Sequence, residues 1–476
     1  MKLHFSPLEK NRASLKTRFR IWPHFATLMA CLAVGISSAQ ASQAPVYTVE
    51  DSWEIAEVPA GFPVGFCLLT SGQKQYAAYY DDERRMTVAS RLIDSDKWTF
   101  QVLPSKVGWD SHNYITMAVD DEGQLHVSGN MHASPLVYFR TESPGDVTTL
   151  EKMPMTGEKE NRATYPKFIR DAEGRLVFHY RHGGSGRGIE IYNLYDPEAG
   201  QWQRLLDQPL IDGEGRMNAY MDGPKMGPDG WFHMHWVWRD TPDCATNHHL
   251  SYARSKDLLH WESAFGHKVT LPVVLGQKSL WVDPIPSRGG IINGGHKLFF
   301  DANQRPVITY HKRDAEDNMQ IYAARAEEGQ WVIRRLTNWD APVPFSGRGS
   351  MGFIGIRIKP LERVEPGLLT MTYQHKDYGN GRLVIDEATL RPLDKKFEMP
   401  PDYSARLNRV RSDFPGMTVQ RTNDIGDSGD PATKYILQWE TLKRNFDRPR
   451  QPPLPEPSML RLYKLTSEAR DGSRNY

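Results

Sequence analysis

The segment 111–140 (SHNYITMAVDDEGQLHVSGNMHASPLVYFR) holds histidines at places where chemistry is common. His112 stands beside Asn113 and His132 beside Met131, just outside alternating apolar runs that predict β-strands. Polar side chains at strand ends are where a rigid β scaffold usually carries chemistry, and imidazole exchanges protons near neutral pH. Lone histidines are also often structural, so both interpretations stay open at this point.

A second group lies in 164–188 (TYPKFIRDAEGRLVFHYRHGGSGRG), where Tyr165 begins one predicted strand and Arg181 ends the next. A hairpin turning at Asp171 to Gly174 would bring these two residues to the same end of the sheet. A guanidinium group can bind a carboxylate through two hydrogen bonds, which suits an anionic substrate. The alternative is a surface arginine stacked on a tyrosine. The glycines after Arg181 are not a P-loop, because no Lys-Ser/Thr pair follows them.

A third group, 231–254 (WFHMHWVWRDTPDCATNHHLSYAR), has the composition of a metal site. His233 and His235 alternate along one strand and face the same side, and Cys244 and His248 follow after a turn. Thiolate and imidazole are preferred zinc ligands, so we predict that these four residues bind Zn²⁺, with Ca²⁺ as an alternative. Four protein ligands would leave no open position, which favours a structural ion. The spacing fits no tight zinc signature.

These groups belong to a repeated pattern of short strands. An apolar strand, a turn of the D-x-x-G type, a second strand and a later tryptophan recur within 120–140, 171–202, 227–261 and 301–331. A degenerate repeat with several strands per copy is typical of β-propeller blades, and a buried tryptophan in each copy (98, 202, 261, 331) favours that fold. We therefore predict an all-β, seven-bladed β-propeller. A β-sandwich with decorated hairpins is the alternative.

The composition limits the class of partner and the compartment. The 59 basic and 58 acidic side chains nearly cancel, which argues against a nucleic-acid binder. A basic start, the apolar run 25–36 and small residues up to Ala41 predict a secretory signal peptide, 1–41, before a single domain, 42–476, that ends in a C-terminal strap from Pro452. We expect a secreted or periplasmic monomer without a membrane span. Lipid attachment at Cys31 is less favoured because the apolar run continues past it.

Three stretches resemble the BNR-repeat propeller proteins that include the ulvan lyases: HNYITMAVDDEGQLHVSGNMH, TYPKF with FHYRHGGSGRG, and WVWRDTPDCATNHHLSYARSKDLLHW. The resemblance implies a seven-bladed propeller that cleaves the bond to the uronic acid of a sulfated algal polysaccharide by β-elimination. It also implies that His112 and His132 are paired active-site histidines, that Tyr165 is the catalytic tyrosine and that Arg181 neutralises the uronate. The family's bound metal supports the predicted zinc site.

The implied chemistry agrees with these residue types. Removing a proton next to a carboxylate requires neutralisation of that carboxylate, a base near C5 and an acid near the leaving O4. We predict that Tyr165 and His132 move the protons, with His112 orienting or sharing that task, while Arg181 binds the carboxylate. Asn113, Asn130, Tyr180 and Arg239 are the predicted substrate-binding residues.

Other functions stay open on sequence alone. A lyase acting on rhamnose linked to glucuronate in plant arabinogalactan would need the same uronate chemistry. A carbohydrate-binding propeller without activity, or a sialidase-like hydrolase, is the third hypothesis. Paired carboxylates of the glycosidase kind cannot be identified from spacing, because they are usually distant in sequence.

Overall fold

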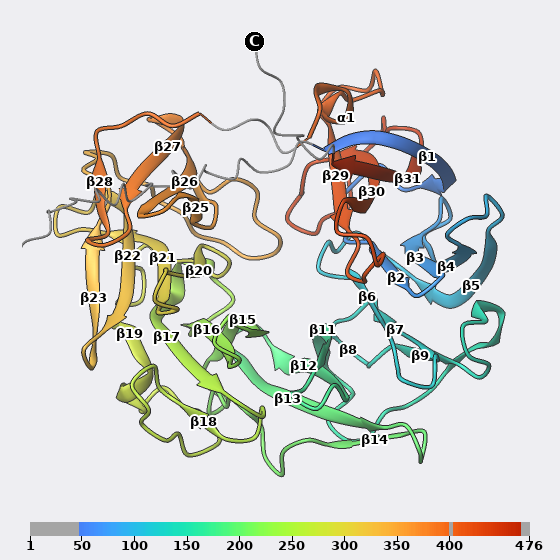
Figure 1. Ribbon diagram of the computed structural model, residues 1–476, viewed down its shortest axis with the longest axis horizontal. Coiled ribbons are helices and arrows are strands. Elements are labelled where there is room, and N and C mark those ends of the chain that lie inside the picture. The colour runs from blue at the N-terminus through green and yellow to red at the C-terminus, as the bar shows by residue number, and fades with distance from the viewer. Residues whose placement is uncertain (1–46, 399–402, 468–476) are drawn as a thin grey trace, which may run out of the picture. The chain divides into compact units, whose positions relative to one another are not determined.

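The structure is a computed structural model that describes residues 47–398 and 403–467 (Figure 1). The predicted signal peptide lies outside these residues, and all of them belong to one unit, Ser42–Tyr476. Nearly all regular structure here is β-strand. The described helices are short: α1 (Ala405–Asn408) and the 3-10 turns η1 (Val147–Thr149), η2 (Cys244–Thr246) and η3 (Lys278–Leu280). None of the helices in the described part of the chain is long and apolar enough to cross a membrane.

The described strands form seven antiparallel sheets of four or five strands each. The first sheet contains β2 (Cys67–Ser71), β3 (Lys74–Tyr80), β4 (Arg85–Leu92) and β5 (Thr99–Lys106). The second contains β6 (Ile115–Val119), β7 (Leu125–Gly129), β9 (Tyr138–Thr141) and β10 (Leu150–Lys152). The third contains β8 (His132–Ser134), β11 (Ala163–Arg170), β12 (Leu176–Gly184), β13 (Arg187–Asp196) and β14 (Gln201–Arg204).

The later sheets follow in chain order. The fourth contains β15 (Asn218–Met226), β16 (Phe232–Arg239), β17 (Asn247–Ser255), β18 (Trp261–Glu262) and β19 (Trp281–Asp283). The fifth contains β20 (His296–Phe300), β21 (Pro306–Arg313), β22 (Met319–Glu327) and β23 (Gln330–Arg335). The sixth contains β24 (Ile356–Ile358), β25 (Glu362–Glu365), β26 (Leu368–His375), β27 (Gly379–Asp386) and β28 (Arg391–Leu393). The seventh contains β29 (Met417–Asn423), β30 (Thr433–Leu442), β31 (Ser458–Ser467) and β1 (Tyr47–Val58).

The seventh sheet joins the two ends of the described chain. Strand β1 pairs with β31 over the full length of both, from Tyr47 opposite Ser467 to Val58 opposite Ser458. Figure 1 shows the sheets following one another around a common centre, with the first coloured strand beside the last. The segment after Pro452 therefore leads into a strand between β30 and β1. This pairing stabilises a propeller-like fold. The first and last strands of the described chain cannot separate without breaking the hydrogen bonds between β1 and β31.

The predicted repeat corresponds to structure. At Asp120, Asp171 and Asp301 the side-chain Oδ1 accepts a hydrogen bond from the backbone N–H four residues later, at 2.8–2.9 Å. These bonds hold the tight turns between the first two strands of a sheet. The repeated tryptophans occupy or directly precede the outer strands, where Trp202 packs with Tyr138 of the preceding sheet and Trp261 with residues such as Tyr192. The tryptophans thus fill the space between neighbouring sheets, as predicted.

Candidate active site

The two predicted histidines lie side by side and share one carboxylate. Their ring centres are 4.3 Å apart. Nδ1 of His112 lies 2.7 Å from Oδ1 of Asp110, and Nδ1 of His132 lies 2.5 Å from the other oxygen, Oδ2. Because both rings are held through Nδ1, the opposite nitrogen, Nε2, is left for the cavity that both residues line. A shared carboxylate therefore sets the orientation of both imidazoles.

A crossing between sheets places His132 at this position. After Gly129 the chain leaves the second sheet, and the short strand β8 adds to β11 of the third, with His132 opposite Thr164 and Ser134 opposite Ala163. Ala133 is the extra residue in this pairing and has a φ of 54°. Its N–H donates to Oγ1 of Thr164 at 2.7 Å. The irregularity turns His132 toward the centre, which is a common function of bulges near active sites.

A second β-bulge, in strand β11, determines the direction of the Tyr165 side chain. In the β11–β12 ladder Thr164 pairs with Arg181 and Lys167 with His179, so Tyr165 and Pro166 together oppose the single residue Tyr180. Tyr165 has a φ of 60°, an unfavourable value for a bulky side chain. Such strain is found at functional sites where the surrounding structure imposes it. Its ring centre lies 6.1 Å from that of His112, so the phenol and the imidazoles share one wall of the cavity.

Arg181 lies behind this tyrosine and is almost completely buried, with 1% of its surface exposed. Its guanidinium carbon is 4.9 Å from the centre of the Tyr165 ring, and Nη2 donates to Thr164 Oγ1 at 3.2 Å. Nε and Nη1 find no acceptor among the described residues. A Cβ at position 188 would lie 2.9 Å from Cδ of Arg181, so Gly188 leaves the room that the side chain occupies. A buried cation without a carboxylate partner is unfavourable unless an anion is near.

Tyr220, which the sequence did not indicate, lies between two guanidinium groups. The guanidinium carbon of Arg181 is 5.8 Å from its ring centre and that of Arg239 is 5.2 Å away. Its hydroxyl lies 2.8 Å from Oγ of Ser185. Burial raises the pKa of Tyr220, but the two guanidinium charges outweigh burial and lower the pKa below its ordinary value. Burial and the neighbouring Tyr220 raise the pKa of Tyr165, so the two phenols are pushed in opposite directions.

Asp447 adds a long-range contact to the histidine pair. Its Oδ2 lies 3.2 Å from Nδ1 of His112 and accepts a hydrogen bond from the N–H of Ser350 at 2.6 Å. Burial lowers the pKa of His112, but the carboxylates of Asp110 and Asp447 outweigh burial and raise the pKa from 6.5 to about 9. His112 is therefore protonated at neutral pH.

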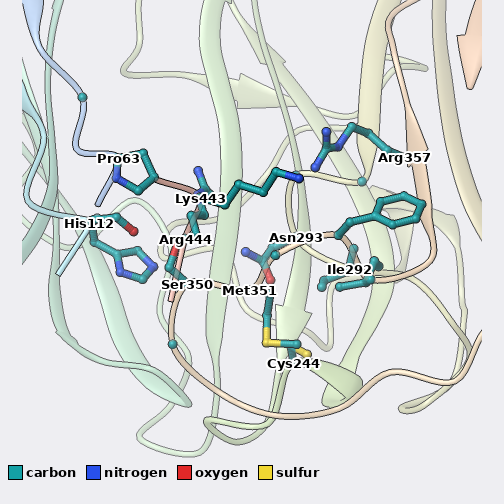
Figure 2. A pocket seen from close by; sticks show the side chains of 18 of the residues that line it. Pro63, His112, Cys244, Ile292, Asn293, Ser350, Met351, Arg357, Lys443 and Arg444 are labelled. Atoms are coloured by element: carbon teal, nitrogen blue, oxygen red, sulfur yellow. The ribbon is translucent and has the colours of Figure 1, made fainter. Parts of the chain in front are cut away.

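These groups line a cavity of about 1140 Å³ (Figure 2). His112, His132, Tyr165 and Tyr220 form one side. No aspartate or glutamate is among the described residues that line it. Six arginine and lysine side chains are among the described residues that do line it: Arg239, Arg348, Arg357, Arg421, Lys443 and Arg444. The cavity therefore combines proton-transfer groups with a strongly positive lining, although the whole chain has a net charge of only +1.

A comparison with known families agrees with this fold. The model of the BNR repeat-containing family matches residues 74–339, which is more than half of the chain. The chain belongs to the BNR repeat-containing family. The similarity to ulvan lyases seen in the sequence is confirmed by curated relatives. A long-isoform ulvan lyase of Alteromonas sp. is 31% identical over 151 residues, or 23% of this chain and 15% of that protein.

Further relatives show the extent of the similarity. A short-isoform ulvan lyase of Alteromonas sp. strain LOR is 28% identical over 155 residues, or 23% of this chain and 29% of that protein. The BNR-repeat protein thus spans less than a third of the length of these two relatives. The crystal structure of the polysaccharide lyase Uly1 matches with a TM-score of 0.58 at 13% identity, covering 88% of this chain and 99% of that one. The PL25 ulvan lyase matches with a TM-score of 0.56 at 14% identity, covering 87% and 95%. Matches at this identity show a common fold.

Three of the predicted substrate-binding residues of the BNR-repeat protein are not among the described residues that line this cavity, so a substrate-binding role for them stays a prediction. The Asn113 carbonyl accepts from Tyr80, and Nδ2 of Asn130 donates to Ser105 at 2.8 Å. Tyr180 is fully buried and points to the side opposite Arg181, because successive strand residues alternate. None of the three lines the cavity, whereas Arg239 does.

The predicted zinc ligands do not converge, which corrects that ligand set. Nε2 of His233 pairs with Asp229 at 2.8 Å, and Nδ1 of His235 faces Nδ1 of His296 at 2.6 Å. His248 pairs with Asp240 at 2.9 Å. Cys244 is a free thiol, as is Cys67, and it lines the cavity instead. These four residues therefore do not fit one metal ion, and among the described residues only Asp110, His112 and His132 form a group of three or more His, Cys, Asp or Glu ligands close enough to hold one.

Replacing Asp110 by asparagine is expected to remove a pH-dependent part of the stability. The raised pKa of His112 means that the folded state favours its protonated form. This stabilisation is complete below a pH of about 6.5 and is lost as the pH rises through about 9. We expect wild type to exceed D110N in unfolding free energy by on the order of 2 kcal/mol at low pH, with a much smaller difference above the raised pKa.

Urea unfolding of both proteins near pH 6 and near pH 10 measures this difference. The exposed Asp82, exchanged for asparagine, is the matched control, since it touches neither histidine. A difference between wild type and D110N that is the same at both pH values would contradict the assigned contact.

Proposed function

We propose that this protein is a polysaccharide lyase that cleaves a uronic-acid-containing, sulfated polysaccharide of the ulvan type by β-elimination. The observation that carries the proposal is the lining of the cavity, in which imidazoles and phenols stand beside guanidinium groups without a carboxylate. Hydrolysis by the usual glycosidase route needs two carboxyl groups facing the bond. Elimination needs a base, an acid and a cation near the substrate carboxylate, and these are the groups present.

We assign the role of His132 from its hydrogen bond, and the roles of His112 and Tyr165 from the directions of their pKa shifts. The Asp110 carboxylate accepts a hydrogen bond from Nδ1 of His132, which leaves Nε2 toward the cavity as the atom that accepts the C5 proton. His112 is already protonated at neutral pH and adds positive charge instead. The raised pKa of Tyr165 keeps its phenol protonated, which suits it as the acid for O4.

The bond changes follow from these roles. The C5 proton moves to Nε2 of His132, and the electron pair of the broken C5–H bond forms the double bond between C4 and C5. The bond between C4 and O4 breaks, and the Tyr165 proton goes to O4. Arg239 lines the cavity and can contact the substrate carboxylate, while Arg181 acts from beneath the two phenols as a positioning charge.

The finer structural assignments belong to the same proposal. We take the seven sheets as the blades of a seven-bladed propeller that forms one catalytic domain, 42–476, with the last sheet as its closure. Export through the predicted signal peptide would bring this domain to an extracellular polysaccharide. Zn²⁺ or Ca²⁺ binding stays a prediction, and no step of the reaction is assigned to an ion.

Ultraviolet absorbance during incubation with ulvan tests the proposal, because only elimination creates an unsaturated uronate. New absorbance with ulvan is the expected result. Absorbance with gum arabic alone would replace the proposed substrate by arabinogalactan. No absorbance with either polysaccharide would contradict lyase activity and favour a binding protein.

A further inference from the structure

The active-site cavity continues onto the sixth sheet through shared residues. A second cavity, of about 520 Å³, is lined by residues of β24, β26 and β27 and by Lys359. Arg357 and Gln374 line both cavities. A single elongated ligand could therefore lie in both.

The register of the sixth sheet explains why these residues share one face. Arg357 pairs with Gln374, and Gln374 pairs with Asn380, so these three side chains form a row across the strands. The N–H of Lys359 bonds to the carbonyl of Thr372, which pairs with Arg382, and this forms the next row. Opposed residues of an antiparallel ladder, and residues two apart on a strand, point to the same side. We call these six residues the basic face.

The two sides of this sheet differ in character. Ile356, Ile358 and Met371 point to the other side and pack with residues of the fifth sheet such as Ile321 and Val307. The basic face instead contains three cations and no carboxylate among its described lining residues. Arg357 and Lys359 are exposed, and within the described chain neither forms an ion pair with a carboxylate. Two exposed cations on one face, Arg357 and Lys359, with no carboxylate partner among the described residues, suit an anionic ligand.

The seventh sheet faces the active-site cavity with polar groups as well. Thr418, Gln420 and Thr422, alternate residues of β29, line it. Lys443 follows β30, and Figure 2 shows its side chain extending toward that of Arg357. Two cations that point toward one another repel unless an anion lies between them.

We propose that the basic face is a distal subsite that binds an anionic substituent of a polysaccharide, a sulfate ester or a second carboxylate, on a sugar several residues from the bond that is cut. The identity of the ligand as a polysaccharide rests on the proposed function. The ring of Tyr373 lies across Gly381 of β27 on the other side of the sheet, where it packs 5.1 Å from the ring of Trp339. The basic face itself therefore consists of polar and charged side chains.

The test measures binding separately from turnover. Affinity electrophoresis in gels containing ulvan or desulfated ulvan reports the dissociation constant of the complete chain in a Y165F background, in which the polysaccharide stays intact. Lys359 is the chosen position because it lines the distal cavity alone. We expect K359E to weaken ulvan binding by about fivefold or more, as for reversal of one exposed charge contact. The matched control K97E reverses an exposed charge outside both cavities and is expected to change binding less than about twofold.

The outcomes separate the ligands and the two proposals. A loss with native ulvan but not with desulfated ulvan identifies the sulfate ester, and an equal loss with both identifies the carboxylate. Unchanged binding by K359E, or an equal loss in K97E, overturns the subsite. Weaker binding by K359E together with no unsaturated product from wild type would keep the subsite and contradict the lyase. Formation of unsaturated product by wild type, together with unchanged binding by K359E, would support the lyase and contradict the subsite.

Discussion

Replacing Arg181 by alanine is expected to lower kcat/KM on ulvan by about 100- to 1,000-fold, the usual effect of removing one preorganised charge. The guanidinium lies 4.9 Å from the ring centre of Tyr165 and 5.8 Å from that of Tyr220. Its removal takes away positive charge beneath the groups that contact the substrate. Ultraviolet absorbance of the unsaturated product gives the rate. Retention of more than about a tenth of the wild-type rate would contradict the role.

A spectroscopic readout separates this role from a loss of packing. Because the Arg181 charge contributes to lowering the pKa of Tyr220, R181A should raise the pKa of that phenol. Titration of tyrosinate absorbance in R181A, with Y220F to identify the signal, measures the change. R181K keeps the charge and should restore most of this titration, although lysine lacks the planar fork of arginine. An unchanged Tyr220 titration in a folded R181A protein would show that the arginine has only a structural function.

Exchange of Tyr165 for phenylalanine is expected to lower kcat by about 100-fold or more, with a much smaller change in KM, because general acid catalysis contributes 10²- to 10⁴-fold. The substitution removes one oxygen and leaves the ring in its bulge. Steady-state kinetics by product absorbance measures both constants.

Tyr180→Phe is the matched control for this variant. Both tyrosines belong to the same hairpin, but Tyr180 packs on Phe178 on the far side and does not line the cavity. We expect Y180F to keep kcat within about threefold of wild type, apart from a small loss of stability. Equal losses in Y165F and Y180F would contradict the assignment of Tyr165 as the acid.

Local patterns were sufficient to predict the strands and the main residues of the candidate site. Alternating apolar residues, aspartate turns and repeated tryptophans depend on neighbours in sequence, and they predicted the sheets and the contacts between them. The hairpin at Asp171 to Gly174 has a short connection, so the proximity of Tyr165 and Arg181 followed from counting residues. Asp110 stands two residues before His112 and could have been considered as its partner.

Only the tertiary structure decided which side chains meet. Asp447 reaches His112 across 335 positions of sequence, and Tyr220 acquires its lowered pKa from arginines on two different sheets. The four predicted zinc ligands have suitable chemistry, but each of the three histidines has a nearer partner. Sequence spacing specifies a side chain's face on its own strand, whereas the neighbouring sheets determine whether that face meets the core, the active-site cavity or the basic face. These contacts depend on residues far apart in the chain, so they appear only when the sheets are assembled.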